Sequence, residues 1–186
     1  MSQDQQLLKQ LSEGSTSERK DALSSLYEKY AKDIYHFLLY YSRNDIQLSK
    51  DILQDVFLKI YEKASQYDCT RPFKPWAIQI ASNLCKNKYK RQNLQEQFKS
   101  SQSSEFNIYN SNENSDLNKT INEAIKLLPW KSREVIILKY KLKLSLEEIS
   151  QVLNIPVGTV KSRIYYANKA LSESKIIKNI NHEERR

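Results

Sequence analysis

Apolar residues recur every three to four positions through much of the chain, and this spacing is typical of amphipathic helices. The first such stretch runs over residues 22–41 and the second over residues 46–66. After a loop over residues 67–74, a third helix is expected from Pro75 to about residue 92. Only two glycines and four prolines occur, and strands have little support. The pattern therefore predicts an all-α fold.

Each of these helices has one apolar stripe, which we expect to face a core. The stripe residues are Leu23, Leu26, Tyr27, Tyr30, Ile34, Phe37 and Leu38 in the first helix, Leu48, Ile52, Leu53, Val56, Phe57, Ile60 and Tyr61 in the second, and Trp76, Ala77, Ile80, Ala81 and Leu84 in the third. Trp76 is thus expected in the core rather than at a binding surface.

The composition changes after residue 92, where Ser, Asn and Gln make up more than half of the following stretch and apolar residues lose their period. Such a composition is typical of a flexible tether between domains. Helical periodicity returns afterwards, stops at Pro129 and resumes at Val135. The expected organisation is a first helical domain over 1–92, a linker over 93–117, a second helical domain over 118–175 and a basic tail over 176–186.

The stretch from Leu144 to Leu171 predicts a helix-turn-helix. Ser145 and Glu148 have the spacing of a capping box that opens a helix, and residues 154–156 supply a turn. A second helix then follows, with an inner stripe of Val160, Ile164, Ala167 and Leu171. The local signals agree with one another, which strengthens the assignment.

The outer face of that second helix carries groups suited to DNA. At about 100° per residue, the inner stripe leaves polar, basic and aromatic residues outside. Lys and Arg can donate to guanine or phosphate, Ser can bond to either, and an aromatic ring can pack on a thymine methyl. The alternative is an ordinary helical hairpin with a solvated basic face. The candidate duplex contacts are Thr159, Lys161, Ser162, Arg163, Tyr165, Tyr166 and Lys169.

The chain has 30 Lys plus Arg against 22 Asp plus Glu, a net charge of +8 that favours a polyanionic partner. Its third helix is a second basic element, because no acidic residue occurs between Arg71 and Gln95. Lysines there, Lys88 among them, can contact phosphates, amides can reach bases, and aromatic rings in the preceding loop can stack on unpaired bases. The candidate single-strand contacts are Tyr67, Phe73, Lys74, Asn83, Lys86, Asn87 and Lys90.

The second helix differs in charge, because its outer face carries Asp51, Gln54 and Asp55 on an otherwise basic chain. Such a face is either a docking surface or a solvated helix surface, which is the default for exposed charge. A metal-dependent phosphoryl-transfer site built on Asp51 and Asp55 is rejected, because one carboxylate pair without further ligands or a Gly-rich loop is too little. No catalysis is expected.

Cofactors, metals and membranes are not expected partners. Cys69 and Cys85 form no C-x-x-C pair, and His36 and His182 lie far from them in sequence, so a zinc site is not expected. We expect two reduced, partly buried thiols. No apolar stretch approaches the roughly 18 to 20 residues that span a bilayer, and the N-terminus is polar where a signal peptide is apolar. The protein is expected in the cytoplasm, without membrane insertion.

Two groups of motifs resemble a known family. The run D-I-L-Q-D-V-F-L-K-I-Y at 51–61 and F-K-P-W-A-I-Q-I-A-S-N-L at 73–84 resemble region 2 of extracytoplasmic-function sigma factors. The run L-L-P-W-K-S-R-E-V-I-I-L-K-Y at 127–140, S-L-E-E-I-S at 145–150 and V-G-T-V-K-S-R-I at 157–164 resemble region 4 of the same family. Both groups occur in the family's order with a variable linker between them.

The resemblance implies a subunit that gives core RNA polymerase its promoter specificity. It implies that the Asp51, Gln54 and Asp55 face binds the β′ clamp helices, and that the 67–75 loop and Asn83 read the −10 element as single-stranded DNA. Region 4 is expected to read the −35 element as duplex and to dock on the β flap. Tyr166 departs from the family pattern, in which many members carry Arg, so the −35 sequence preference is left open.

The resemblance also implies regulation by a separate anti-sigma factor, because neither an autonomous N-terminal domain nor a long C-terminal extension is expected. The main alternative is a polymerase-independent regulator whose helix-turn-helix binds an operator while the N-terminal helices dimerise or sense a signal. That alternative predicts tight duplex binding by the isolated protein.

Overall fold

The structure, a computed structural model, describes residues 3–42, 45–68, 71–98 and 116–174, with the backbone alone for 89–98 and 116–120. Over these residues the chain forms eight α-helices and no strand, which confirms the all-α prediction. The chain divides into two compact units, residues 1–105 and 106–186, and each is described by itself. The division falls inside the predicted linker, most of which lies outside the described residues, as does the predicted tail.

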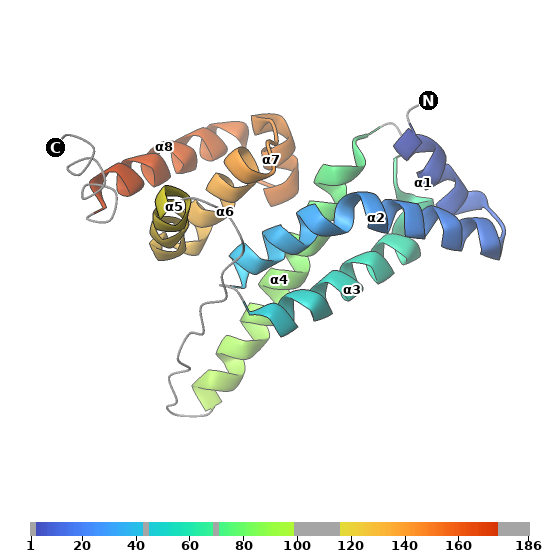
Figure 1. The fold of residues 1–186 in the computed structure, drawn as a ribbon, viewed down its shortest axis with the longest axis horizontal. Coiled ribbons are helices and arrows are strands. Elements are labelled where there is room, and N and C mark those ends of the chain that lie inside the picture. The colour runs from blue at the N-terminus through green and yellow to red at the C-terminus, as the bar shows by residue number, and fades with distance from the viewer. Residues whose placement is uncertain (1–2, 43–44, 69–70, 99–115, 175–186) are drawn as a thin grey trace. The chain divides into compact units, whose positions relative to one another are not determined.

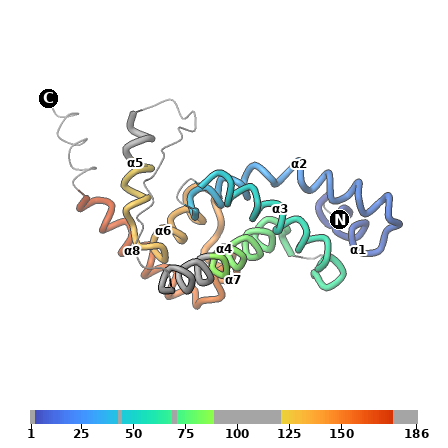
Figure 2. The backbone as a smooth tube through the Cα atoms, turned by 90° about the horizontal axis from the view of Figure 1, so that it is seen from below, coloured from blue at the N-terminus to red at the C-terminus, as the bar shows by residue number. Residues whose placement is uncertain are grey.

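Unit 1 consists of α1 (Gln3–Glu13), α2 (Thr16–Tyr41), α3 (Ile46–Lys63), a short 3₁₀ helix η1 (Ala64–Gln66) and α4 (Phe73–Phe98). Helices α2 and α3 lie side by side, and α4 packs against both (Figures 1 and 2). Helix α1 folds back onto the first part of α2 and also contacts η1. The three helices expected from periodicity are therefore present, and a fourth precedes them.

The core of unit 1 lies between α2, α3 and α4. Its fully buried side chains include Leu26, Ile34, Phe37 and Leu38 of α2, Ile52, Val56 and Ile60 of α3, and Phe73, Ala77, Ile78, Ala81 and Cys85 of α4. Residues at the edges of the predicted stripes are less buried: Tyr27 is exposed, and its ring lies over Phe57 with the centroids 4.7 Å apart. Trp76, expected in the core, is only half-buried.

Helix α1 was not predicted, because its sequence is rich in Gln and has too few apolar residues to show a clear stripe. In the structure only two of its side chains, Leu8 and Leu11, are fully buried. A capping box starts α2 directly afterwards: the Ser15 backbone N–H donates to Glu18 Oε2 at 2.7 Å, and the Glu18 N–H donates to Ser15 Oγ at 3.4 Å. The hydrogen bonds from Ser15 hold the pKa of Glu18 below its usual value. Helix α2 therefore begins six residues before the predicted start at residue 22.

Unit 2 consists of α5 (Asp116–Leu127), α6 (Trp130–Ile136), a π-helical turn η2 (Ile137–Lys141), α7 (Leu146–Leu153) and α8 (Val157–Glu173). Helix α8 packs against α6 and α7, and its core contacts join Ala167 to Ile125, Leu128 and Ile136. The buried guanidinium of Arg133 donates to the backbone oxygens of Lys126 and Leu128, which satisfies carbonyl groups at the end of α5.

Candidate functional site

Helix α3 presents Asp51, Gln54 and Asp55 on the side opposite its buried stripe, and we call these three residues the α3 acidic surface. Asp51 and Gln54 are exposed, and Asp51 Oδ1 accepts a hydrogen bond from Gln47 Nε2 at 2.9 Å. The buried residues Ile52 and Val56 alternate with them along the helix and fix its orientation. The structure therefore brings the three residues onto one outward face, as the periodicity predicts.

Asp55 also contacts α4, which the sequence did not indicate. Its Oδ2 lies 3.2 Å from Nζ of Lys88, with 46% of the Asp55 side chain and 32% of the Lys88 side chain exposed. Lys88 was expected to contact phosphates. The packing of α4 on α3 directs Lys88 toward the α3 acidic surface, so an ion pair joins the two helices.

The segment before α4 holds Tyr67 against Trp76. The two rings are stacked with centroids 4.1 Å apart, and the Tyr67 hydroxyl lies 3.0 Å from the backbone oxygen of Arg71 and 2.9 Å from that of Pro72. One face of Tyr67 is therefore covered by Trp76, while both side chains remain partly exposed. The pair forms a small aromatic platform at the start of α4.

Phe73, whose ring was expected to stack on unpaired bases, lies in the core instead. The side chain is 1% exposed, and its ring packs on Tyr30 at 4.8 Å and on the edge of Trp76 at 5.9 Å between centroids. Helix α4 begins at Phe73 rather than at Pro75, so this residue points into the core instead of lying in a loop. Phe73 is therefore a structural residue.

The remaining candidates on α4 lie at or near its surface. Asn83 and Asn87 are exposed and Lys86 is half-buried. Lys74 forms an ion pair with Asp33 of α2, with Nζ and Oδ2 2.6 Å apart. Lys90 falls in the part of α4 whose side chains lie outside the described residues. The two asparagines thus agree with the predicted outer face of this helix.

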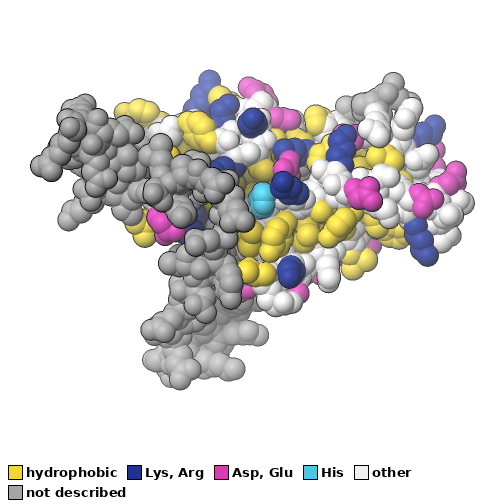
Figure 3. All heavy atoms as spheres, in the orientation of Figure 1, with side chains coloured by type: hydrophobic (Ala, Val, Ile, Leu, Met, Phe, Trp, Pro, Cys, Tyr) yellow, Lys and Arg dark blue, Asp and Glu magenta, His cyan; other side chains and the backbone are white. Residues whose placement is uncertain are grey.

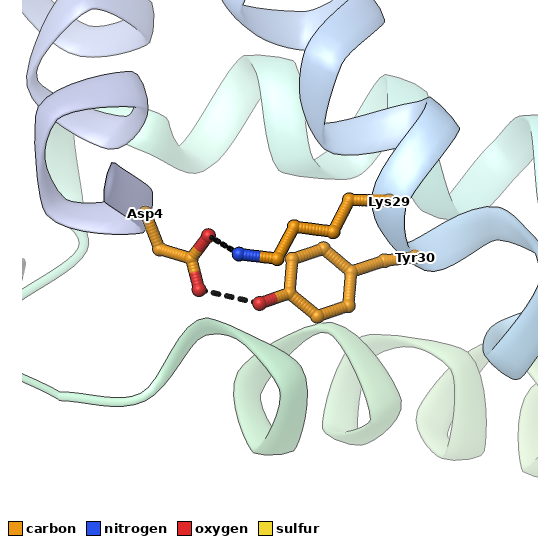
Figure 4. A network of polar contacts seen from close by, with 3 residues as sticks. All are labelled: Asp4, Lys29 and Tyr30. Carbon is orange, nitrogen blue, oxygen red and sulfur yellow. Dashed lines mark hydrogen bonds and ion pairs between the residues drawn. The ribbon is translucent and has the colours of Figure 1, made fainter. Parts of the chain in front are cut away.

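A polar network ties α1 to the buried side of this region (Figure 4). Asp4 accepts an ion-paired hydrogen bond from Lys29 at 2.6 Å and another from the Tyr30 hydroxyl. Burial and the bond to Asp4 raise the pKa of Tyr30 well above its usual value. Because the Tyr30 ring packs on Phe73, the network connects α1 to the first turn of α4.

The helix-turn-helix of unit 2 forms as predicted. The Ser145 backbone N–H donates to Glu148 Oε2 at 2.7 Å, and the Glu148 N–H donates to Ser145 Oγ at 3.1 Å, so α7 has the expected capping box. Asn154 ends α7 in the left-handed conformation with φ of 53°, which Asn tolerates better than most residues. Val160 and Ala167 are fully buried, and they orient α8.

The outward side chains of α8 form one continuous surface, which we call the α8 surface. Lys161, Ser162, Tyr165, Tyr166 and Lys169 are exposed, and Thr159 and Arg163 are half-buried at its edges. The structure therefore places all seven predicted duplex contacts on or beside the same face. Three of them, Lys161, Arg163 and Lys169, are cationic, which suits an anionic ligand.

The described part of the chain offers neither a metal cluster nor a membrane span. Among the described residues no group of three or more His, Cys, Asp or Glu side chains lies close enough to hold an ion. No helix within these ranges is long and apolar enough to cross a bilayer.

On the face of the molecule drawn in Figure 3, charged side chains of both signs lie among hydrophobic ones, so the basic excess is not gathered into one patch on that face.

Two family profiles match the chain, one in each unit. Sigma-70 region 2 matches residues 26–95, and Sigma-70 region 4 matches residues 119–171. The ECF RNA polymerase sigma factor SigW of Bacillus subtilis is 31% identical over 165 residues, which cover 82% of this chain and 88% of SigW. The ECF RNA polymerase sigma-E factor of Haemophilus influenzae is 28% identical over 187 residues, covering 93% of this chain and 95% of that protein.

Solved structures share the fold. The sigma factor RpoE of Bartonella quintana, in complex with the anti-sigma factor NepR, has a TM-score of 0.74 at 20% identity and covers 83% of this chain and 96% of its own. CnrH, in complex with the cytosolic domain of CnrY, has a TM-score of 0.66 at 22% identity over 91% of this chain and 94% of its own. The fold is thus that of a two-domain helical sigma factor. The chain belongs to the sigma-70 family, in its extracytoplasmic-function (ECF) group.

Proposed function

We propose that this sigma factor binds core RNA polymerase through the α3 acidic surface and contacts promoter DNA through α4 and α8. The observation that carries the proposal is a pair of distinct outward faces: Asp51, Gln54 and Asp55 lie together on α3, while exposed amides lie on α4 and exposed lysines lie on α8. A polyanion such as DNA is attracted by the second set and repelled by the first. The acidic surface is therefore assigned to a protein partner.

The partner assigned to the α3 acidic surface is the pair of clamp helices of the polymerase β′ subunit, as the region 2 match implies. Asp51 and Gln54 are exposed, and Asp55 forms a partly exposed ion pair that leaves 46% of its side chain exposed, so all three are accessible to a partner. Exposed charge complementarity mainly sets specificity and association rate, while adjacent buried contacts supply much of the affinity.

The segment around α4 is assigned to the −10 element as single-stranded DNA. Asn83 and Asn87 offer amides for base edges, and the Tyr67–Trp76 platform offers aromatic surface for an unpaired base. Base stacking on such a ring contributes about 1–3 kcal/mol, which offsets the few kcal/mol needed to unstack a base. Lys74 and Lys86 supply positive charge nearby. Promoter melting is favoured in this way without a catalytic step by the sigma factor.

The α8 surface is assigned to the −35 element as duplex DNA, with α8 in the major groove. Its N-terminal half carries Lys161 and Ser162, and the aromatic pair follows one turn later. Each DNA-binding unit alone is expected to bind weakly and in a salt-sensitive manner. Holding both units on one polymerase raises their effective concentration for two promoter elements at once.

We propose regulation by an anti-sigma factor because structurally similar proteins were solved in complex with protein partners, one of which is an anti-sigma factor. RpoE of Bartonella quintana and CnrH were solved with an anti-sigma factor and with a cytosolic domain of CnrY, respectively. We assign the same type of control to this chain, with sequestration under uninduced conditions. Affinity capture of the tagged chain from uninduced source cells is expected to return a stoichiometric partner that is absent from captured holoenzyme. Capture of the chain only with core polymerase would contradict this part of the proposal.

The core-binding assignment is tested by charge reversal at Asp51. We expect Asp51→Lys to reduce affinity for core polymerase at least tenfold and to abolish promoter-directed transcription in a reconstituted assay, because a cation then faces a cationic partner. Asp21→Lys is the matched control, since Asp21 is an exposed carboxylate on α2 in the same unit. Circular dichroism reports that both variants are folded. Equal core affinity for Asp51→Lys and wild type would refute the assignment.

The alternative function, a polymerase-independent regulator, is separated by a second measurement. That alternative requires the isolated chain to bind a specific duplex tightly at physiological salt. The sigma-factor proposal requires specific binding only after core polymerase is added. Nanomolar sequence-specific binding by the isolated chain would favour the regulator.

A further inference from the structure

Two adjacent tyrosines dominate the centre of the α8 surface. Tyr165 and Tyr166 are 64% and 65% exposed, and their rings meet edge to face with centroids 5.4 Å apart at 78°. Neither hydroxyl has a hydrogen-bond partner within the part of the chain that the structure describes. Large aromatic side chains are rarely left in water side by side, and when they are, they commonly mark a contact surface.

The turn of α8 that carries the two tyrosines, residues 164–167, contains no cationic side chain. Ser162 lies one turn before the tyrosines on the same face, and its hydroxyl donates to the backbone oxygen of Thr159 at 3.1 Å. Lys161 lies at the flank of this face, and Lys169 lies one turn after the tyrosines, 4.0 Å from Glu173. Cations therefore border the aromatic pair, in positions suited to phosphates, while phenol rings occupy the middle.

The chemistry of the base edges limits what such a centre can read. In the major groove guanine offers two acceptors, which a guanidinium or ammonium group satisfies best, whereas thymine offers a C5-methyl group. A tyrosine hydroxyl can donate only one hydrogen bond, and its ring is apolar over both faces and most of its edge. The aromatic centre of the α8 surface is thus poorly matched to guanine and well matched to a methyl group.

We propose that Tyr166, supported by Tyr165, is a specificity-determining residue that selects thymine in the upstream promoter element by packing its ring on the C5-methyl group. This inference rests on the proposed function, because it requires α8 to lie in the major groove of the −35 element. Tyr165 supports Tyr166 by holding its ring edge to face, so the two rings lose less rotamer freedom when a base arrives.

The experiment removes the methyl group and nothing else. Holoenzyme reconstituted with the full chain is bound to promoter duplexes in which each thymine of the footprinted upstream element is replaced in turn by deoxyuridine. Uracil keeps the O4 acceptor and the pairing edge of thymine. We expect at least one replacement to weaken wild-type binding about fourfold, the effect of one buried methyl group. The same replacement is expected to leave binding by Tyr166→Ala unchanged.

Tyr166→Phe is the matched control, because it keeps the ring and removes the hydroxyl. It is expected to retain the full sensitivity to deoxyuridine. An upstream footprint that contains no thymine, or that tolerates every deoxyuridine replacement in wild type, overturns the inference while the proposed function stands. Loss of methyl sensitivity in Tyr166→Phe also overturns it, because the hydroxyl would then be the reader. Absence of any upstream footprint overturns the proposed function and this inference together.

Discussion

The ion pair between Asp55 and Lys88 joins the α3 acidic surface to α4, with 3.2 Å between Oδ2 and Nζ. If Asp55 must face a cationic partner on core polymerase, Lys88 competes with that partner for the same carboxylate. Replacing Lys88 by Met keeps much of the aliphatic stem and removes the charge. The variant is therefore expected to bind core polymerase more tightly than wild type does.

The magnitude follows from the exposure of the pair. Two unit charges 3.2 Å apart in bulk water attract by roughly 1.3 kcal/mol. Side-chain entropy and salt screening reduce such exposed pairs to about 0.2–1 kcal/mol. Removing the competitor is therefore expected to raise core affinity by about 1.4- to 5-fold, since ~1.4 kcal/mol corresponds to a factor of ten. The gain is expected to shrink as salt rises, because screening weakens exposed pairs.

A fluorescence competition titration of core polymerase against labelled wild type measures this gain. Lys126→Met is the matched control, because Lys126 forms a partly exposed pair with Glu123 in unit 2 and its loss changes the net charge equally. In an Asp55→Asn background, Lys88→Met is expected to have no further effect. Core binding that weakens in Lys88→Met, or that rises equally in Lys126→Met, would refute the reasoning.

Three further predictions concern stability, each measured by urea denaturation followed by circular dichroism. Gly14→Ala is expected to lower the free energy of unfolding by about 1–3 kcal/mol, because a Cβ there meets the Gln10 backbone oxygen at 2.5 Å; an unchanged midpoint would contradict the packing. Gly158→Ala is expected to be neutral or to stabilise by up to ~1 kcal/mol, because nothing lies within 4 Å of that Cβ and Ala favours helix; a clear loss would be contrary evidence. Tyr30→Phe is expected to cost about 1–2 kcal/mol at pH 8, where the hydroxyl bonds to Asp4. The pKa of Tyr30 is raised in the folded state, so the hydroxyl stabilises the fold fully below the unfolded-state pKa of about 10. This stabilisation is lost as the pH rises further. The difference in free energy of unfolding between wild type and Tyr30→Phe is therefore expected to narrow above pH 10. A constant gap would show that the hydroxyl has no such role.

The features of the fold that depend on neighbours in sequence were predictable. The capping box of Ser145 and Glu148, the turn at Asn154 and the inner stripe of α8, whose successive members lie three or four positions apart, each depend on near neighbours in the sequence. Helical periodicity also placed Asp51, Gln54 and Asp55 on one outward face. Local chemistry and a fixed helical repeat are sufficient for such assignments.

The features that depend on packing between helices could not be predicted from the sequence. Phe73 looked like a loop residue, but its ring is buried and packs on Tyr30 of α2 and on Trp76. Lys88 looked like a phosphate contact, and only the approach of α3 pairs it with Asp55. Helix α1 was missed because two buried leucines among glutamines give a weak stripe, although the capping box that follows it was visible in the sequence.

This sigma factor is proposed to bring core polymerase to promoters through separate polymerase-binding and DNA-binding surfaces on one chain. The most direct test adds the purified chain to core polymerase on a library of genomic fragments from the source cells and sequences the 5′ ends of the transcripts. We predict new, discrete starts preceded by two shared sequence motifs near positions −10 and −35, absent with core alone and with Asp51→Lys. Starts that match those of core alone, or new starts that persist with Asp51→Lys, would contradict the account.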